Sequence, residues 1–109
     1  MDRGEIIVFV SCRPQEGERI ACELVAEKLA ACVNIIPGIK SIYRWKGEVC
    51  QETENLLIIK SHKAYWPRLE ARIKELHSYE VPEIISVAIE DGSQDYLNWI
   101  RSQLEGAFR

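Results

Sequence analysis

The side chains in this sequence best suited to metal chemistry are its cysteines and histidines. A thiolate and an imidazole are soft and borderline donors that suit copper or zinc. No two cysteines form a Cys-x-x-Cys pair, and their spacing fits no zinc finger, so there is no local metal motif. We expect at least two of the cysteines to be small buried hydrophobes. The residues are Cys12, Cys22, Cys32, Cys50, His62 and His77.

Composition narrows the function classes. The 109 residues are 47% hydrophobic, which predicts one folded domain spanning residues 1–109. The formal net charge is −3 and no basic tract is present, so a nucleic-acid partner is disfavoured. There is no Ser-His-Asp arrangement and no glycine-rich phosphate loop. We therefore expect no enzyme, which leaves open only an active site assembled between subunits.

The lengths of the apolar runs predict where in the cell the protein resides. Residues 1–12 resemble no signal peptide, because acidic residues come early and the apolar run is short. No stretch approaches the roughly 18 apolar residues of a spanning helix, so we expect no membrane partner. The sequence thus predicts a cytoplasmic protein whose cysteines stay reduced.

The elements that must position these side chains follow from hydrophobic periodicity. They alternate as β-α-β-β-α-β with a helix appended, which predicts an α+β, ferredoxin-like split βαβ fold with an antiparallel sheet. Strands 6–10 and 48–61 are then central, with 6–10 buried on both faces, and Pro37 suits the edge position of strand 33–45. The charged side chains of helix 67–77 are expected to face solvent. The expected elements are strands 6–10, 33–45, 48–61 and 84–89 and helices 15–31, 67–77 and 93–104.

The two middle strands form a hairpin that is too long for its own helices. Lys46-Gly47 is a plausible two-residue turn. Strand 33–45 would reach roughly 40 Å, whereas helix 67–77 covers only about 16 Å. The projecting tip carries apolar and aromatic side chains that need cover from another copy of the chain. The alternative is a hairpin that curls over its own sheet. The tip residues are Ile42, Tyr43, Trp45 and Val49, of which Tyr43 and Trp45 are the predicted subunit-interface residues.

Five motifs stand along the chain in this order: ACVNIIPG (31–38), IYRWKG (42–47), LLIIK (56–60), HSYEVPEII (77–85) and DYLNWI (95–100). Together they resemble the CutA divalent-cation-tolerance proteins. That resemblance implies a ferredoxin-like homotrimer in which long hairpins pair between subunits. It also implies tolerance to copper and other divalent metals, binding of ions such as Cu(II) without an obligatory cofactor, and no established catalytic reaction.

The resemblance also implies a metal site. Cys12 matches a cysteine ligand at the end of the first strand, and His77 matches a histidine ligand, although Leu76 stands where the family has another histidine. Topology supports the pair independently, because the end of strand 6–10 and the end of helix 67–77 lie at the same end of the domain. Glu80, Glu83 or a neighbouring subunit would complete the site. The alternative is that neither residue binds a metal. Cys12 would then be a small buried hydrophobe, and His77 would interact favourably with the helix dipole at the end of its helix.

Two alternatives stay open. If Lys46-Gly47 is the hairpin loop, Cys32 lies opposite Ser61 and next to His62, unless a bulge at Pro37-Gly38 shifts the register. For function, the alternative is a PII-like trimeric signalling module that binds a small effector in clefts between subunits. The absence of a glycine-rich phosphate cradle counts against a nucleotide effector. An RNA-binding module shares the element order, but residues 56–59 carry no aromatic side chain.

Overall fold

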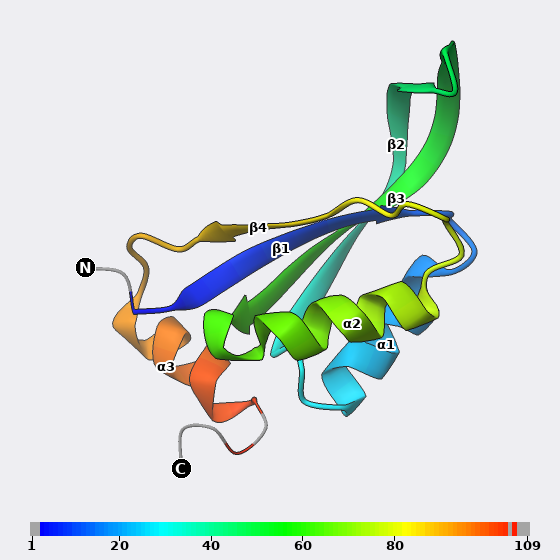
Figure 1. Ribbon diagram of the computed structural model, residues 1–109. Coiled ribbons are helices and arrows are strands. Elements are labelled where there is room, and N and C mark those ends of the chain that lie inside the picture. Colours follow the sequence, from blue (N-terminus) through cyan, green and yellow to red (C-terminus); the bar gives the residue numbers. More distant parts are fainter. Residues whose placement is uncertain (1–2, 105, 107–109) are drawn as a thin grey trace.

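The computed structural model describes residues 3–104 and 106 and contains a four-stranded sheet with its helices on one face (Figure 1). The elements follow the predicted order, with a short 3₁₀ turn (η1) before the second long helix. In chain order they are β1 (Glu5–Cys12), α1 (Gly17–Ala26), β2 (Cys32–Trp45), β3 (Glu48–His62), η1 (Lys63–Tyr65), α2 (Trp66–Leu76), β4 (Ile84–Ala88) and α3 (Gln94–Ser102).

The sheet confirms the ferredoxin-like α+β prediction. Its strand order is β2-β3-β1-β4, so β1 and β3 are central and β2 and β4 are edges. All neighbouring strands run antiparallel. Pro37, which has no N–H to donate, lies on the edge strand β2, as its chemistry requires.

Helix α1 ends five residues earlier than its apolar pattern predicted. The Leu29 N–H donates to the Leu24 carbonyl and the Lys28 N–H donates to the Val25 carbonyl, a Schellman motif that closes the helix. Lys28 takes φ 60°, the left-handed conformation usually given to glycine at this position. The apolar residues after it are buried in the turn that leads to β2, so their burial does not signal helix.

Strand alternation places one row of side chains against the helices. Val8 and Val10 of β1 and their partners Ile59 and Leu57 of β3 are fully buried there. Ile20 and Leu24 of α1, Leu69 and Ile73 of α2, and Leu97 and Ile100 of α3 complete this core.

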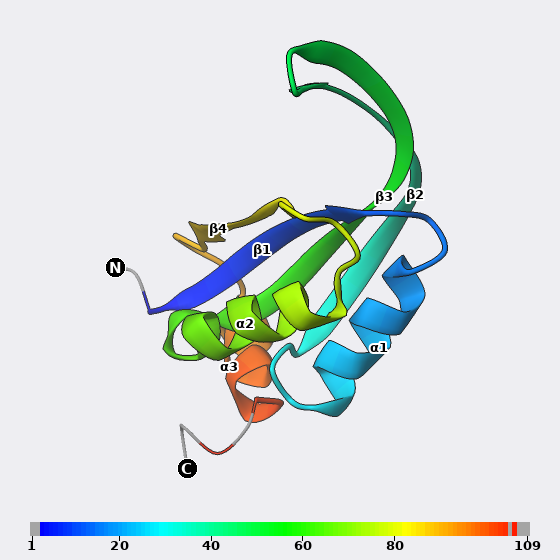
Figure 2. The ribbon, with the colours of Figure 1, turned by 45° about the vertical axis from the view of Figure 1, so that its right-hand side comes forward.

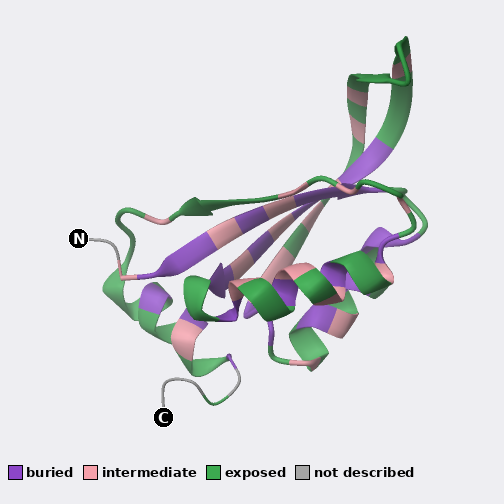
Figure 3. Ribbon diagram, in the orientation of Figure 1, coloured by how far each residue is buried: buried purple, intermediate pink, exposed green. Residues whose placement is uncertain are grey.

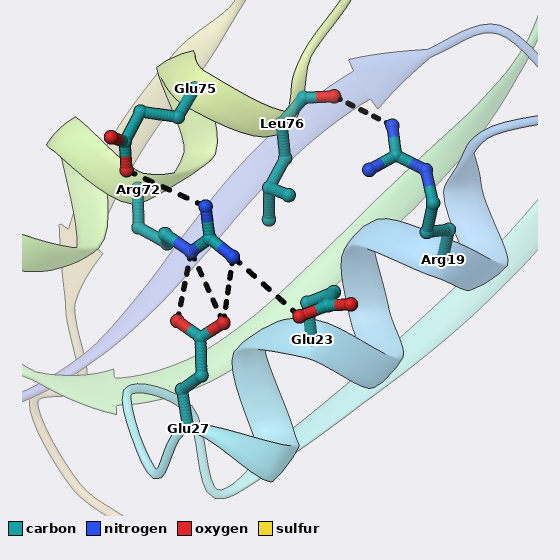
Figure 4. Close-up of polar contacts among 6 residues, drawn as sticks. All are labelled: Arg19, Glu23, Glu27, Arg72, Glu75 and Leu76. Atoms are coloured by element: carbon teal, nitrogen blue, oxygen red, sulfur yellow. Dashed lines mark hydrogen bonds and ion pairs between the residues drawn. The ribbon is translucent and has the colours of Figure 1, made fainter.

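An ion-pair cluster joins α1 to α2 (Figure 4). The Arg72 guanidinium donates from Nε to Glu27 Oε1 at 2.9 Å and from a terminal nitrogen to Glu27 Oε2 at 2.8 Å. The carboxylate raises the pKa of Arg72 and the guanidinium lowers the pKa of Glu27. Arg19 donates to the Leu76 carbonyl at 2.9 Å and ties α1 to the last residue of α2. The expectation that the charged side chains of α2 all face solvent was therefore wrong for Arg72, which is part-buried between the helices.

The opposite face of the sheet carries no helix, and its edge strand β4 is exposed (Figure 3). On β1, Ile7 and Phe9 point to this face and are only partly buried. Their β4 partners Val87 and Ile85 are 46% and 53% exposed. The prediction that β1 is buried on both faces is therefore met on the helical face and only partly on the other in a single chain.

The β2–β3 hairpin extends well beyond the helical layer and arches over the helix-free side (Figure 2). Lys46 and Gly47 form the predicted two-residue turn, both with positive φ (50° and 83°). The register shifts between Ile36 and Ile39, so the bulge at Pro37-Gly38, which the sequence left open, is present. The two long arms pair on both sides of this bulge, which lets the hairpin hold its shape away from the core.

Candidate functional site

Cys12, the last residue of β1, points into the core. Its side chain is fully buried, beside Gly17 of α1 and Asn55 of β3. Burial first, and then the carboxylates of Glu16 and Glu54, raise the pKa of the Cys12 thiol to about 11. The thiol is therefore protonated at neutral pH, which is unsuited to nucleophilic attack.

His77 caps the end of α2 and has both ring nitrogens engaged. The backbone N–H of Tyr79 donates to Nδ1 at 3.1 Å, so the Nε2–H donates to the carbonyl oxygen of Ser11 at 2.7 Å. Glu16 Oε1 lies 3.5 Å from Nδ1, and the Tyr79 ring lies 4.7 Å away. The buried imidazole thereby fixes the segment after α2 against the end of β1.

The structure brings Cys12 and His77 to the same end of the sheet, because His77 bonds the residue adjacent to Cys12. Glu83, one suggested third ligand, instead accepts a hydrogen bond from the Ser11 hydroxyl at 3.3 Å. Within residues 3–104 and 106, no group of three or more His, Cys, Asp or Glu side chains is placed to hold a metal ion. In this arrangement the pair does not fit a bound metal by itself, and its role as a ligand pair stays a prediction.

The rival pair Cys32 and His62 is separated by the bulge. The shifted register places Cys32 opposite Lys60 instead of Ser61. His62 lies beyond, where its Nδ1 accepts from the Ala64 N–H and its Nε2 meets the Arg3 carbonyl at 3.1 Å. Burial lowers the pKa of His62.

A cleft of about 700 Å³ opens between the projecting part of the hairpin and the segment that joins α2 to β4. Carboxylates from both walls converge on it, against a single guanidinium, that of Arg13. Sequence reasoning missed this cleft because it exists only once the hairpin has curled (Figure 2). The lining residues are Ser11, Arg13, Ser41, Ile42, Tyr43, Trp45, Glu52, Glu54, Ser78, Tyr79, Glu80, Val81 and Glu83.

One hydrogen bond joins the two walls of the cleft. The Tyr79 hydroxyl donates to Glu54 Oε2 at 2.6 Å, and Glu54 is only 5% exposed. Burial and this bond raise the pKa of Tyr79 above its ordinary value. The Arg13 guanidinium lies over the Tyr79 ring, 5.5 Å from its centre. Through these contacts the α2–β4 segment is attached to the start of the projecting hairpin.

The predicted interface residues Tyr43 and Trp45 lie on the arched hairpin, each 40% exposed. Directly paired residues share a face of the ribbon, and the pairs Tyr43–Cys50 and Ser41–Glu52 alternate with Arg44–Val49. Tyr43 and Trp45 therefore face the same side as Glu52, toward the cleft, whereas Val49 faces away. The sequence suggested that the tip is one apolar patch, whereas in the structure its apolar side chains lie on two faces of the hairpin.

Helices long and apolar enough to cross a membrane do not occur in the described part of the chain.

Comparison with known proteins gives consistent matches. A family model, CutA1 divalent ion tolerance protein, matches residues 6–103. The divalent-cation tolerance protein CutA of Thermus thermophilus is 48% identical over 98 residues, which cover 89% of this chain and 95% of that protein. The chain spans only 55% of the length of the rice chloroplastic relative, Protein CutA 1, at 44% identity.

Solved structures show the same fold. The crystal structure of CutA1 from Oryza sativa superposes with a TM-score of 0.92 at 39% identity, covering 97% of this chain and 98% of that one. The PII-like protein CutA from Nostoc sp. PCC 7120 gives a TM-score of 0.87 at 39% identity, covering 92% and 97%. With a family model across nearly the whole chain and relatives well above 30% identity, this chain belongs to the CutA1 divalent ion tolerance family.

Proposed function

We propose that the chain forms a cytoplasmic homotrimer that binds divalent metal ions such as Cu(II). The observation that carries the proposal is the family match over residues 6–103, whose description names divalent ion tolerance. We assign no reaction to it, because that description names a tolerance and no reaction.

The apolar helix-free face of the sheet supports self-association. Ile85 and Val87 stand beside Phe9 and Ile7 on this face, with no helix over them. Burying one such side chain completely is worth about 1.5–3 kcal/mol. The hairpin adds Tyr43 and Trp45, so packing against other copies would cover both surfaces.

Sedimentation velocity tests the assembly. The expected result is one species of three times the chain mass at micromolar concentration, and Ile85→Glu should shift it toward smaller species. Glu90→Lys, an exposed change beyond β4, is the control and should leave the mass unchanged. A stable single chain at micromolar dilution would contradict the proposal.

For the metal, we propose Cys12 and His77 as donors, with further ligands supplied by a neighbouring subunit. Titration calorimetry of the assembled protein with Cu(II) and Zn(II) tests this. Cys12→Ala and His77→Ala should weaken binding, while Cys22→Ala, which removes an exposed thiol on α1, should not. Equal affinity in all three variants would remove Cys12 and His77 from the site.

The second candidate function is a PII-like module that binds a small effector. The cleft of about 700 Å³ favours it, since ligand pockets commonly enclose about 300–1,000 Å³. The neighbour from Nostoc is itself described as a PII-like protein. A thermal-shift screen of nucleotides, organic acids and amines tests this function. A denaturation midpoint that no compound raises would argue against it.

A further inference from the structure

We infer that His62 forms a proton-sensitive joint: when its ring takes up a proton in mild acid, the hydrogen bond that holds the start of η1 breaks, and the connection between β3 and α2 loosens. The inference goes beyond the proposed function, because the joint needs neither a metal ion nor an effector. It also concerns the other end of the sheet, since His62 pairs with Glu5 at the start of β1, whereas Cys12 ends that strand.

The neutral ring of His62 joins two segments that are far apart in the sequence. The Ala64 N–H donates to Nδ1 at 3.0 Å, which makes His62 the side-chain cap of η1. Nδ1 therefore carries no hydrogen, and the Nε2–H donates to the carbonyl oxygen of Arg3 at 3.1 Å. The ring thus connects η1 to the residues just before β1, and it can do so in one tautomer only.

A proton on Nδ1 is incompatible with this arrangement. A protonated imidazole carries an N–H at both ring nitrogens. The Nδ1–H would then point at the Ala64 N–H, so that two donors would face each other. The bond to the Arg3 carbonyl survives, because Nε2 carries a hydrogen in both forms. The bond to Ala64 is therefore the one that protonation breaks.

The packing around the ring restricts how it can turn away. His62 is only 5% exposed. A Cβ atom on Gly4 would lie 2.5 Å from Nε2, so the ring rests directly on the Gly4 backbone. The Lys63 N–H donates to the Gly4 carbonyl at 2.8 Å and fixes this backbone beside the ring. We therefore expect η1 to give way, and with it the packing of Tyr65, which is only 2% exposed.

The surroundings of His62 favour the neutral ring near neutral pH. Burial is the main influence and lowers the pKa of His62, and the positive charges of Arg101 on α3 and Lys63 on η1 act in the same direction. The Arg3 carbonyl and the Glu5 carboxylate, which lies 3.3 Å from the Arg3 guanidinium, offset part of this effect. Because folding lowers this pKa below the ordinary 6.5, stability falls as the pH drops below that value. The joint is therefore closed at neutral pH and opens in mild acid.

Hydrogen exchange measured by NMR on the assembled wild-type protein, from about pH 7.5 to about pH 5, tests the joint. The ring-proton shift of His62 reports its protonation, and the protection of the Ala64 amide, corrected for the intrinsic effect of pH on exchange, reports the cap. This protection should fall about tenfold as His62 takes up its proton, which is the effect of losing one hydrogen bond. The Tyr96 amide is the matched control, because the Ser93 hydroxyl caps it at the start of α3 without titrating, and it should keep its protection.

The variant His62→Asn supplies the second arm of the experiment. Asparagine is a preferred capping residue whose side-chain oxygen can accept from the Ala64 N–H, and it takes up no proton. The protection of Ala64 should then be independent of pH over the same range. The variant also assigns the ring signal of His62, because His77 is the other histidine of the chain.

Three results would overturn the inference: protonation of His62 with unchanged protection of Ala64, a loss of protection that persists in His62→Asn, or a His62 ring that stays neutral throughout the range. If His62→Asn does not fold, the two wild-type curves carry the test. Coincident midpoints for the protonation of His62 and the loss of protection at Ala64 support the joint, and separate midpoints contradict it.

Discussion

Replacing Tyr79 with phenylalanine tests whether the α2–β4 segment is fastened to the hairpin. The substitution removes the hydroxyl that donates to Glu54 Oε2 at 2.6 Å and keeps the ring that packs beside His77. Glu54, only 5% exposed, is then left without its donor. The perturbation thus removes one buried hydrogen bond to a carboxylate with little change in volume.

The size of the effect follows from the type of bond. A hydrogen bond to a charged group contributes about 1.5–3 kcal/mol, and leaving a charged partner buried costs at least as much. We therefore expect Tyr79→Phe to lower the free energy of unfolding by about 2 kcal/mol. The pH dependence adds a second signature. The folded chain raises the pKa of Tyr79 above its ordinary 10.0, so stability from this phenol is complete below about pH 10 and falls as pH rises further.

Urea unfolding followed by circular dichroism, at one fixed protein concentration, measures both effects. The concentration is held constant because the stability of an oligomer depends on it. Tyr96→Phe removes a hydroxyl from a ring that is 41% exposed and is the control, with an expected change below about 0.5 kcal/mol. If Tyr79→Phe has the same urea midpoint as the wild type, and also loses stability above pH 10 as the wild type does, the role given to this hydrogen bond is refuted.

Three further predictions follow from local geometry. Lys28→Gly relieves a positive φ at the end of α1 and should stabilise the fold by about 1 kcal/mol, seen as a higher urea midpoint at constant slope; a lower midpoint would contradict the strain. In native protein, iodoacetamide should modify the exposed Cys22 well before the buried Cys12, because a pKa of about 11 leaves little Cys12 thiolate. Mass spectrometry of digests reports the order of modification. The pKa of His62, measured by NMR titration, should lie below 6.5, so its contribution to stability is lost as pH falls; a value at or above 6.5 would show that burial is not the dominant influence.

The arrangement of the strands could be predicted from the sequence because it depends on local chemistry. Strands of alternating or continuous apolar residues and the Lys46-Gly47 turn specify the hairpin. Pro37 lacks the N–H that a central strand must donate, which placed β2 at an edge and left a bulge there open. The projection of the hairpin beyond the helices likewise follows from the rise per residue, since a strand is longer than a helix with the same number of residues.

The end of α1 and the environment of Arg72 could not be predicted in the same way. Lys28 is an ordinary helix former by type, and nothing in its neighbours signals the left-handed turn that closes the helix. Arg72 belongs to a charged row on α2. Its contact with Glu27 can be predicted only if the distance between α1 and α2 is known. Both features depend on distances between elements that periodicity does not encode.

By itself, the sequence determined the element order, the sheet topology, the family and the shared location of Cys12 and His77 at one end of the sheet. Only the tertiary structure decided what those two side chains do there: the thiol is buried, and both imidazole nitrogens are engaged in hydrogen bonds. It also decided that carboxylates as far apart in sequence as Glu54 and Glu83 line one cleft. The physical reason is that hydrogen-bonding partners and cavities arise from the curl of the hairpin over the sheet, a long-range arrangement that local residue patterns do not specify.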